Sequence, residues 1–393
     1  MSTTDEQLDA FLAALPEVRK AETEEEREAI FAFRYQVYGE ELGRKLGTEK
    51  GVKRTHDDED DKPYSTLLYT ADEKGITGTS RMRVWEPGEV PAKDFAKFSM
   101  ERLPGIERLR TGEGERLMVR PDQRSGLVIA ALSLAVLDLG RPDWYIDLLF
   151  GYCTPGLVPY YLNMGWRRYA GRMIPTPDGI HAPLVLVISD VEHFRSVGSF
   201  LAAPIERENF EPLDTAPFTE LFEERNLPVQ FDKELVRAAI DRGVAADVGF
   251  LAGISTEAIE TLAEKGFVIQ LPSGELLTEA GLGERELFVI IDGEFESFSE
   301  ECVLRRMGPG EVVGEVAFFS SDGRRTASVR SVRDGRVLVL RRRVVDELRD
   351  SAPAVAAEIL FHLARTLADR TGRAHVASST AQEMHNPNPV GEF

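Results

Sequence analysis

The stretch GEVAFFSSDGRRTASVR, residues 314–330, places two adjacent arginines directly after a Ser-Ser-Asp-Gly turn. The surrounding chain is acidic, since its 393 residues carry a formal net charge of −20. A guanidinium combined with the free N–H groups of a short helical turn binds a compact anion well. The pattern therefore predicts an anion site, with Arg325 as the charged donor and Glu315 as an acceptor for a neighbouring hydroxyl.

The segments around this stretch predict its fold. After residue 246, short strand-like runs alternate with glycine or proline about every ten residues, which is typical of a small β-roll or sandwich. A helical pattern returns over residues 342–370. Residues 374–393 are polar and contain two prolines, so we expect them to be disordered.

Residues 250–370 resemble the cyclic nucleotide-binding domain, because its motifs occur in order. FLAGIS (250–255) opens the leading helix, and LFVIIDGEFE (287–296) is one of the glycine-punctuated strands. MGPGEVVGEVAFF (307–319) with RRTASV (324–329) forms the phosphate-binding cassette. The resemblance implies a β-roll with C-terminal helices. It also implies cAMP or cGMP as a regulator, since a threonine after the arginine is compatible with either base.

In this resemblance Glu315 accepts a hydrogen bond from a ribose hydroxyl, Arg325 pairs with the exocyclic phosphate oxygens, and Thr326 lies near the phosphate or the base. The alternative is a domain that has lost its ligand, in which Glu315 and Arg325 only pair with each other. Arg324 is expected to be a solvated neighbour. The predicted nucleotide-binding residues are Gly314, Glu315, Val316, Ala317, Arg325, Thr326 and Ala327.

The N-terminal half of the chain predicts an α/β domain with a mixed sheet. Runs such as YSTLLYTA (64–71), GTSRMRVW (78–85) and PLVLVISD (183–190) are typical of strands. GLVIAALSLAVLDLG (126–140) is typical of a buried helix. We divide the chain into a helical arm (1–20), this α/β domain (21–195), a helical linker (196–245), the β-roll domain (246–373) and a disordered tail (374–393).

This α/β domain resembles the GNAT superfamily, in particular its N-acyl amino acid synthase and acyl-homoserine-lactone synthase branch. The helix FRYQVYGEELG (33–43) carries the arginine and the aromatic residue of that branch, Arg34 and Tyr38. The run DDEDD (57–61) follows, where the branch has two aspartates three residues apart. Two pairs have this spacing, Asp57 with Asp60 and Asp58 with Asp61.

Two further motifs extend the resemblance over about residues 25–190. GTSRMRV supplies Arg81, and EGERLMV supplies Glu113 and Arg116. YYLNMGW places Tyr161 where many GNAT enzymes have the acid that protonates the leaving thiolate. The resemblance implies catalytic roles for Arg34, Arg81, Glu113, Arg116 and Tyr161, and substrate binding by Tyr38, Asp58 and Asp61.

Acyl transfer to an amine requires a base for the amine, donors for the thioester oxygen and an acid for the thiolate. Glu113 is the predicted base. The alternative is that these charges are salt bridges that order the N-terminal helix against the sheet. Tyr160 is expected to pack in the core, and Cys153 to be a small buried residue without a nucleophilic role.

GNAT proteins hold the pyrophosphate of coenzyme A with a loop Q/R-x-x-G-x-G/A. Gln123 and Gly126 match this loop, but Val128 replaces its small final residue and should hinder close approach of the backbone. This departure favours the phosphopantetheine thioester of acyl carrier protein over acyl-CoA as the donor. The predicted donor-binding residues are Met118, Val119, Arg120, Gln123, Arg124, Ser125 and Gly126.

The sequence thus predicts an acyltransferase that moves an acyl chain from a thioester to the amine of an amino acid under cyclic-nucleotide control. The alternatives are a protein lysine acetyltransferase using acetyl-CoA and a nucleotide sensor with an inactive acyltransferase fold. An acidic chain disfavours nucleic acid as a partner. We expect neither a metal site nor a membrane span, and a homodimer is compatible with the sequence. Two cysteines fit a cytoplasmic location.

Overall fold

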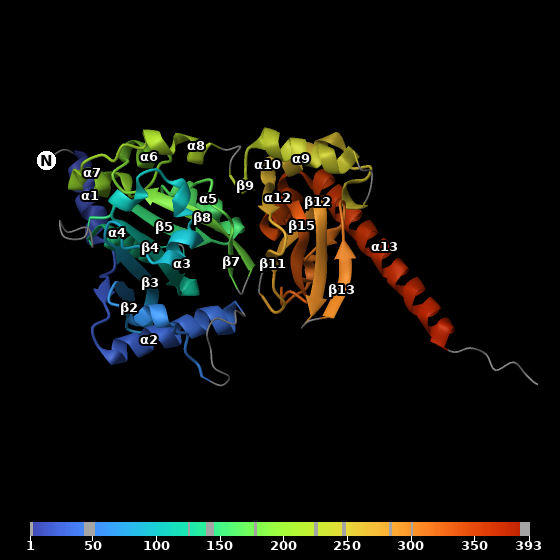
Figure 1. Ribbon diagram of the computed structural model, residues 1–393, viewed down its shortest axis with the longest axis horizontal. Helices are drawn as coiled ribbons and strands as arrows, with labels where there is room; N and C mark the ends of the chain where they lie inside the picture. The colour runs from blue at the N-terminus through green and yellow to red at the C-terminus, as the bar shows by residue number, and fades with distance from the viewer. Residues whose placement is uncertain are drawn as a thin grey trace, which may run out of the picture. The chain divides into compact units, whose positions relative to one another are not determined.

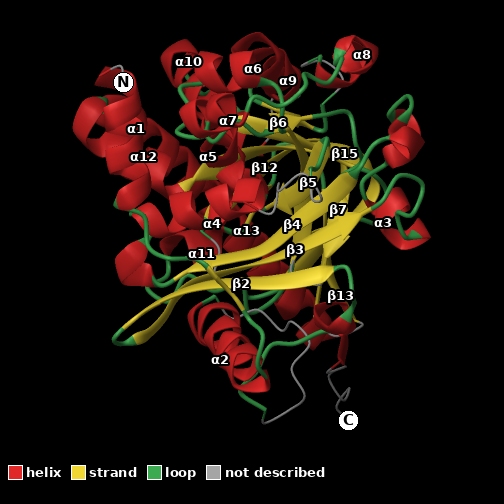
Figure 2. Cartoon of the chain, turned by 90° about the vertical axis from the view of Figure 1, so that its left-hand side faces the viewer, coloured by secondary structure: helices red, strands yellow, loops and turns green. Residues whose placement is uncertain are grey.

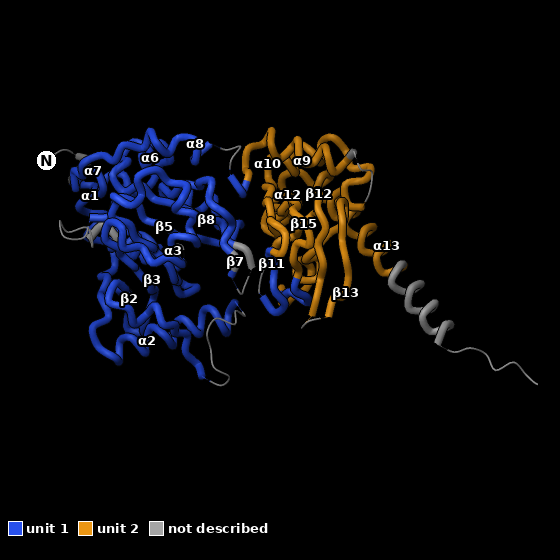
Figure 3. The backbone as a smooth tube through the Cα atoms, viewed as in Figure 1, with its two compact units in different colours: residues 1–229, 275–284, 324–328 blue, residues 230–274, 285–323, 329–393 orange. Residues whose placement is uncertain are grey.

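The computed structural model describes residues 3–42, 52–124, 126–138, 145–176, 179–223, 227–245, 249–282, 285–299 and 302–385. The chain forms two compact units (Figure 3). The first unit comprises residues 1–229, 275–284 and 324–328, and the second comprises residues 230–274, 285–323 and 329–393.

The first unit is built on a mixed sheet whose strands follow the order β1-β2-β3-β4-β5-β8-β6, with β7 beside β8 (Figure 1). Only the β4–β5 pair is parallel among the strand pairs of this unit that the structure describes. This confirms the mixed α/β fold. The strands are β1 (Arg19–Lys20), β2 (Ser65–Asp72), β3 (Gly75–Trp85), β4 (Thr111–Val119), β5 (Leu148–Cys153), β6 (Arg167–Arg168), β7 (Ile174–Thr176) and β8 (Gly179–Val187).

Helices cover both faces of this sheet. Ile30 and Phe31 of α2 pack on Leu67 and Tyr69 of β2. Figure 2 shows α4 on the other side of β2 and β3. The buried helix predicted from residue 126 is α4, as expected. The helices are α1 (Thr3–Ala13), α2 (Glu24–Tyr35), α3 (Ala92–Lys97), α4 (Leu127–Asp138), α5 (Val158–Asn163), α6 (Val191–Ser196), α7 (Ala202–Glu208) and α8 (Thr219–Phe222).

Helix α2 begins with a capping box. The Thr23 hydroxyl accepts from the Glu26 N–H, and the Glu26 carboxylate accepts from the Thr23 N–H at 2.9 Å. The Tyr69 hydroxyl donates to the other oxygen of Glu26 at 2.7 Å. The hydrogen bond from Tyr69, followed by those from the Thr23 and Glu22 amides, lowers the pKa of Glu26 to about 2. The carboxylate thus fixes the start of the helix against β2.

Substitution of Glu26 by glutamine tests this anchor. We expect the variant to melt at a lower temperature than the parent protein at pH 7, because only the ionised carboxylate accepts all these bonds. The pKa is lowered in the folded state, so the contribution is complete above about pH 4.5 and is lost as the pH falls toward about 2. The gap between the two melting temperatures should therefore close over this range. A gap that is independent of pH would contradict the prediction, and Glu25→Gln is the control.

The second unit has a sheet in which β13, β12, β15 and β10 are neighbours in that order, with β14 beside β12. The backbones of β12 and β15 approach closely at Gly293, which has a φ of +86°, and a Cβ on this residue would lie 2.5 Å from the Cα of Gly335. Its strands are β10 (Phe267–Leu271), β12 (Glu286–Ser299), β13 (Cys302–Met307), β14 (Val312–Val313) and β15 (Ser328–Arg341). Two short strands also belong to this sheet: β9 (Val229–Gln230), which pairs with β10, and β11 (Leu276–Thr278), which pairs with β15.

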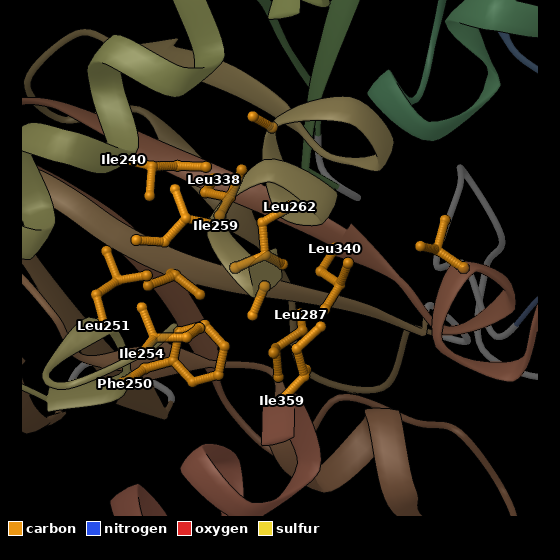
Figure 4. Close-up of a cluster of buried hydrophobic side chains, with 14 of the residues drawn as sticks. Ile240, Phe250, Leu251, Ile254, Ile259, Leu262, Leu287, Leu338, Leu340 and Ile359 are labelled. Atoms are coloured by element: carbon orange, nitrogen blue, oxygen red, sulfur yellow. The ribbon is translucent and has the colours of Figure 1, made fainter. Parts of the chain in front are cut away.

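A core of apolar side chains joins the helices of the second unit to its sheet. Figure 4 shows Ile240, Phe250, Leu262 and Leu338 in this cluster, all of them buried, and Ile359 reaches it from the last helix. This arrangement confirms a β-sheet domain with C-terminal helices. Its helices are α9 (Lys233–Ala245), α10 (Thr256–Lys265), α11 (Glu315–Phe319), α12 (Arg342–Ser351) and α13 (Pro353–His385).

The chain ends differ from the sequence prediction. In the expected N-terminal arm, α1 is followed by the strand β1, which pairs with β2. Helix α13 continues to His385, over residues for which the sequence predicts disorder. No proline interrupts the chain between Pro353 and residue 385, so the helical pattern can continue. Among the described helices, none combines the length and the apolar character that crossing a membrane requires.

Candidate functional site

The first unit contains a cavity of about 1070 Å³. Its size is in the range of sites for small molecules and cofactors. Apolar side chains that line it include Val37, Leu42, Met118, Ile129, Leu157 and Leu184. Polar side chains that line it include Lys97, Glu115, Arg116, Tyr152, Tyr161 and His181.

Two cross-strand ion pairs stand beside this cavity on the face of the sheet that α2 covers. Arg81 of β3 lies opposite Glu115 of β4, and Arg83 lies opposite Glu113. Alternate residues of a strand point to the same side, so the spacing of two places both pairs on one face. Arg81 Nε donates to Glu115 Oε1 at 2.8 Å, and Arg83 donates to Glu113.

A bulge in β4 directs Arg116 to the same network. Thr79 pairs with Met118 and Arg81 pairs with Glu115, so two residues of β4 face one residue of β3. Arg116 has a φ of +56°, a left-handed conformation that costs a residue other than glycine about 1–3 kcal/mol. Its guanidinium donates to Asp57 at 2.5 Å and lies over the Tyr38 ring at 5.6 Å. Such strain is typical of functional sites.

The acidic run forms the 3₁₀ turn η2 (Asp58–Asp61), capped by Asp57. Asp60 is 1% exposed and accepts from Arg34 at 2.7 Å. Asp57 binds Arg81 and Arg116. Burial alone raises the pKa of Asp57, but the two guanidinium groups outweigh it and hold this pKa far below its ordinary value.

The turn corrects the choice of aspartates. Asp58 and Asp61, the predicted substrate-binding pair, are both exposed. Asp61 binds Arg27 at 2.5 Å and His56 at 2.8 Å on the surface. The cap at Asp57 sets the rotation of the turn, so the pair directed inward is Asp57 with Asp60. Sequence spacing alone allowed both pairs.

Arg34 and Arg81 lie behind the cavity wall and do not line the cavity. They are 0% and 2% exposed, and neither lines the cavity. Burial lowers the pKa of Arg34 despite its partner Asp60. Both arginines therefore hold the acidic turn and the strands together. Tyr38 does line the cavity, from the π-helical turn η1 (Gln36–Glu41) that extends α2.

The predicted base, Glu113, lies in the interior. It is 0% exposed, does not line the cavity, and binds Arg83 and Lys97. Burial and the neighbouring Glu115 raise its pKa against the pull of Lys97 and Arg83. Its neighbour on the same face, Glu115, lines the cavity instead.

Tyr161 lines the cavity from α5, as expected for a group that meets the substrate. Its ring packs edge-on against Trp166 and Tyr160, with centroids 5.9 and 6.1 Å away. Burial raises the pKa of the Tyr161 hydroxyl, so it is a neutral proton donor at neutral pH. Tyr160 is 45% exposed and so is not packed in the core. Cys153 is buried, and burial raises its pKa.

The predicted donor residues separate into two groups. Met118, Val119 and Arg124 line the cavity. Arg124 also donates to Val119 O at 3.0 Å and binds Glu41. Arg120 instead binds Asp72 and Asp122 at the surface, which leaves it out of the cavity wall.

The remaining donor residues form the turn before α4. Gln123 ends the 3₁₀ turn η5 (Pro121–Gln123), and its carbonyl accepts from the Gly126 N–H at 3.2 Å. Ser125 lies outside the described residues. Val128 is buried, and it packs so closely on Gly78 that a Cβ on Gly78 would lie 2.6 Å from Val128 Cγ1. The Val128 side chain thus packs between helix and sheet, and its effect on a donor at the loop stays a prediction.

The sequence prediction missed several cavity residues, among them Lys97, Tyr152, His181 and Glu115. Lys97 of α3 binds Glu113 and lies over the Tyr152 ring at 4.3 Å. Tyr152 in turn packs edge-on against His181, 5.5 Å away. Their positions follow from strand register and from a six-residue helix, and no motif marks them. For Glu115, alternation with Glu113 on β4 was the available signal.

Four predicted nucleotide-binding residues lie at the start of α11, which Gly314 enters with a φ of +87°. Glu315 is 6% exposed and pairs with Arg370 of α13. Val316 is 47% exposed, whereas Ala317 is buried. The ion pair of Glu315 is thus made with the last helix, by a residue that the sequence analysis did not consider.

The other predicted nucleotide-binding residues lie on the segment 324–328. Arg325 is 4% exposed, and its backbone bonds to Leu282 O and Gly281 N. Thr326 is exposed and Ala327 is half-buried. Arg324 is not simply solvated, because it donates to Gly281 O at 2.9 Å.

The curated relatives share only a part of their length with this chain. The chain is 31% identical over 118 residues to cGMP-dependent protein kinase isozyme 1 of Drosophila melanogaster, and 26% identical over 123 residues to the Pycsar effector protein BcPycTIR of Burkholderia cepacia. The match spans 30% of this chain and 15% of the kinase, and 31% of this chain and 39% of the effector.

Solved structures resemble a part of the chain. A putative cyclic nucleotide-binding protein from Geobacter metallireducens GS-15 is 18% identical, with 31% of this chain and 91% of that chain covered and a TM-score of 0.28. A cyclic nucleotide-binding domain from Methylobacillus flagellatus KT is 18% identical, with 40% and 88% covered and a TM-score of 0.32.

Two family models match separate parts of the chain. The model described as N-acyl amino acid synthase FeeM matches residues 29–190, and the model described as cyclic nucleotide-binding domain matches residues 268–352. The first match covers the strands and helices that surround the cavity, and the second covers α11 and most of the second unit's sheet. The chain therefore joins an N-acyl amino acid synthase FeeM domain to a C-terminal cyclic nucleotide-binding domain.

Proposed function

We propose that the first domain transfers an acyl chain from a thioester to the amine of an amino acid or a related small molecule, and that cAMP or cGMP bound to the second domain controls this transfer. The observation that carries the proposal is the cavity of about 1070 Å³ in the synthase domain. Its apolar wall suits a hydrocarbon chain. Glu115, Arg116 and Tyr161 on the same wall suit the polar ends of the two substrates.

The reaction needs a donor for the thioester oxygen and an acid for the departing thiolate. Arg116 is a cation on the cavity wall whose position is fixed by the bulge and by Asp57. It can stabilise the negative charge that develops on the oxygen. Tyr161 holds its proton at neutral pH, so it can protonate the sulfur.

Either acyl carrier protein or coenzyme A can carry the acyl thioester in this proposal. Arg124 lines the cavity beside the loop that contains Gln123 and Gly126, and its charge suits a phosphate or an acidic carrier protein. Because the Val128 side chain packs against Gly78, we keep coenzyme A as a donor beside acyl carrier protein. Cys153 and Cys302 are free, which supports a reducing, cytoplasmic setting.

A mass-spectrometric transfer assay tests the function. The full chain is incubated with acyl carrier protein or coenzyme A thioesters of several chain lengths, a mixture of amino acids, and either cAMP, cGMP or no nucleotide. We expect an N-acyl amino acid whose rate of formation changes with one nucleotide. Acetylated protein lysines as the sole product would favour the lysine acetyltransferase, and the absence of any product would overturn the proposal.

For the nucleotide we propose the site implied by the resemblance, with Glu315 accepting from the ribose hydroxyl and Arg325 binding the phosphate. The burial of both side chains, 6% and 4% exposed, supports roles in binding a ligand out of water. Phosphate binding at the first turn around Val316 and Ala317 uses the backbone N–H groups there.

Replacement of Arg370 by alanine should increase the affinity for the nucleotide. Arg370 donates to Oε1 of Glu315, so a ribose hydroxyl that binds this oxygen must displace it. The pair is partly exposed, and such pairs contribute up to about 1 kcal/mol, so the Kd should fall by about two- to fivefold. Isothermal titration calorimetry measures the change. Arg343→Ala, which removes an exposed pair with Glu347 on α12, is the control. An unchanged or higher Kd for Arg370→Ala would contradict the prediction.

A further inference from the structure

Two glutamates of β4 share one face of the sheet but have different environments. Glu113 is 0% exposed and lies outside the cavity wall, with Arg83 and Lys97 on its two oxygens. Glu115 lines the cavity. Only Glu115 can therefore meet a substrate directly.

The contacts of Glu115 are concentrated on one oxygen. Arg81 approaches Oε1 through Nε and Nη2, both at 2.8 Å, and Arg83 Nε lies 3.1 Å from the same atom. Within the described part of the chain, these arginine contacts go to Oε1 and not to Oε2. Oε2 therefore has its lone pairs available to a ligand in the cavity. Arg81 is itself held by Asp57 and Asp60, so the carboxylate is rigidly placed.

We infer that Glu115 binds the amine of the acceptor through Oε2 and takes the proton that this amine loses during acyl transfer. The inference rests on the proposed function and assigns a residue within it. Glu113, the base expected from the sequence, becomes a positioning residue that holds Arg83 and Lys97.

The proton balance of the step is complete without a further reactant. The amine nitrogen forms a bond to the thioester carbonyl carbon, and the bond from this carbon to sulfur breaks. Glu115 Oε2 takes the proton from nitrogen, and the sulfur takes a proton from the Tyr161 hydroxyl. Water then returns the proton from Glu115 to Tyr161. The amine N–H becomes acidic as the nitrogen bonds to carbon, so a carboxylate is a sufficient base at that stage.

The groups around Glu115 keep it ionised. Burial alone raises its pKa, but Arg81, then Lys97, Arg83 and Arg116, outweigh this effect and lower it. The charged and titratable groups that face it are Arg81 and Arg83 on β3, Lys97 on α3, Glu113 and Arg116 on β4, and Tyr152 on β5. Four of these six groups are cations, which explains how Glu115 stays an anion beside Glu113.

The pair of isosteric variants Glu115→Gln and Glu113→Gln tests the inference in the full chain. The acceptors are the amino acid found in the transfer assay and hydroxylamine, whose nitrogen is neutral at pH 7 but loses a proton in the same step. We expect Glu115→Gln to lower kcat for the amino acid by about 10²–10⁴-fold, the usual contribution of a general base. Its rate with hydroxylamine should also fall, because this nitrogen too loses a proton after it bonds to carbon. Glu113→Gln should lower both rates much less, because Glu113 does not line the cavity.

The pH dependence gives a second readout. Both enzymes need the free amine for attack on the thioester, so the rate with the amino acid should rise with pH between 6 and 8 in the parent enzyme and in Glu115→Gln alike. The ratio of the two rates should therefore stay constant over this range, because the base acts after the nitrogen has bonded to carbon. Glu115→Asp keeps the carboxylate and should retain more of the parent rate than Glu115→Gln does. This variant also serves if Glu115→Gln melts below the assay temperature.

Three results would overturn the assignment. One is a Glu115→Gln enzyme with the parent rate, another is a Glu115→Asp enzyme as slow as Glu115→Gln, and the third is a larger loss of rate in Glu113→Gln than in Glu115→Gln. If the parent enzyme transfers no acyl group to any amine, the proposed function fails, and the failure is thereby distinguished from a wrong base.

Discussion

Replacement of Arg81 by methionine is expected to lower the free energy of unfolding of the first unit by about 3–5 kcal/mol, the usual cost of removing one partner from a buried ion pair. Arg81 is 2% exposed and lies within hydrogen-bond distance of Asp57, Asp60 and Glu115. Methionine has a similar length but no charge. The three carboxylates would then share a buried site without the guanidinium between them.

Urea denaturation followed by tryptophan fluorescence measures this loss, because all three tryptophans of the chain fall within residues 1–229. The matched control is Arg207→Met. Arg207 pairs with Asp9 at the surface, where the two side chains are 40% and 50% exposed, so we expect a loss below about 1 kcal/mol. Equal losses for the two variants would mean that the buried network does not stabilise the fold.

The fold was largely predictable because its signals are local. Apolar alternation marked β2, β3 and β8, and a continuous apolar run marked α4. Gly293 lies where β12 and β15 approach closely and Gly314 precedes α11; both have a positive φ, a conformation that glycine adopts easily. The strand β1 has only two residues and exists through its pairing with β2, so its own sequence could not reveal it.

The site was predictable in composition but not in orientation. The motifs led to segments that the structure brings together beside the cavity, yet they could not decide between Asp57/Asp60 and Asp58/Asp61. A hydrogen-bonded cap decides which aspartates of the turn point inward. Similarly, Glu113 and Glu115 alternate identically along β4. Their difference arises from Lys97, which a separate helix brings to Glu113, and no spacing rule includes such a contact.

Replacement of Arg325 by glutamine should raise the Kd for the cyclic nucleotide by about 10- to 150-fold. The variant keeps hydrogen-bond donors but loses the charge that pairs with the phosphate, and one charge-assisted bond contributes about 1.5–3 kcal/mol. Arg325 is 4% exposed, so solvent screens its interaction with a bound anion only weakly. Calorimetric titration with cAMP and with cGMP measures the loss, and a melting curve without nucleotide shows whether the variant is folded.

The neighbouring arginine provides the matched control. Arg324→Gln removes the same charge one residue away, but the Arg324 side chain donates to the carbonyl of Gly281 and is not assigned to the phosphate. Its Kd should therefore rise by less than about fivefold, as expected for a charge that acts through solvent. If Arg324→Gln loses affinity and Arg325→Gln does not, the two arginines exchange roles. If neither variant changes the Kd, the nucleotide does not use this cassette, and control of the acyltransferase must be sought at another anion site.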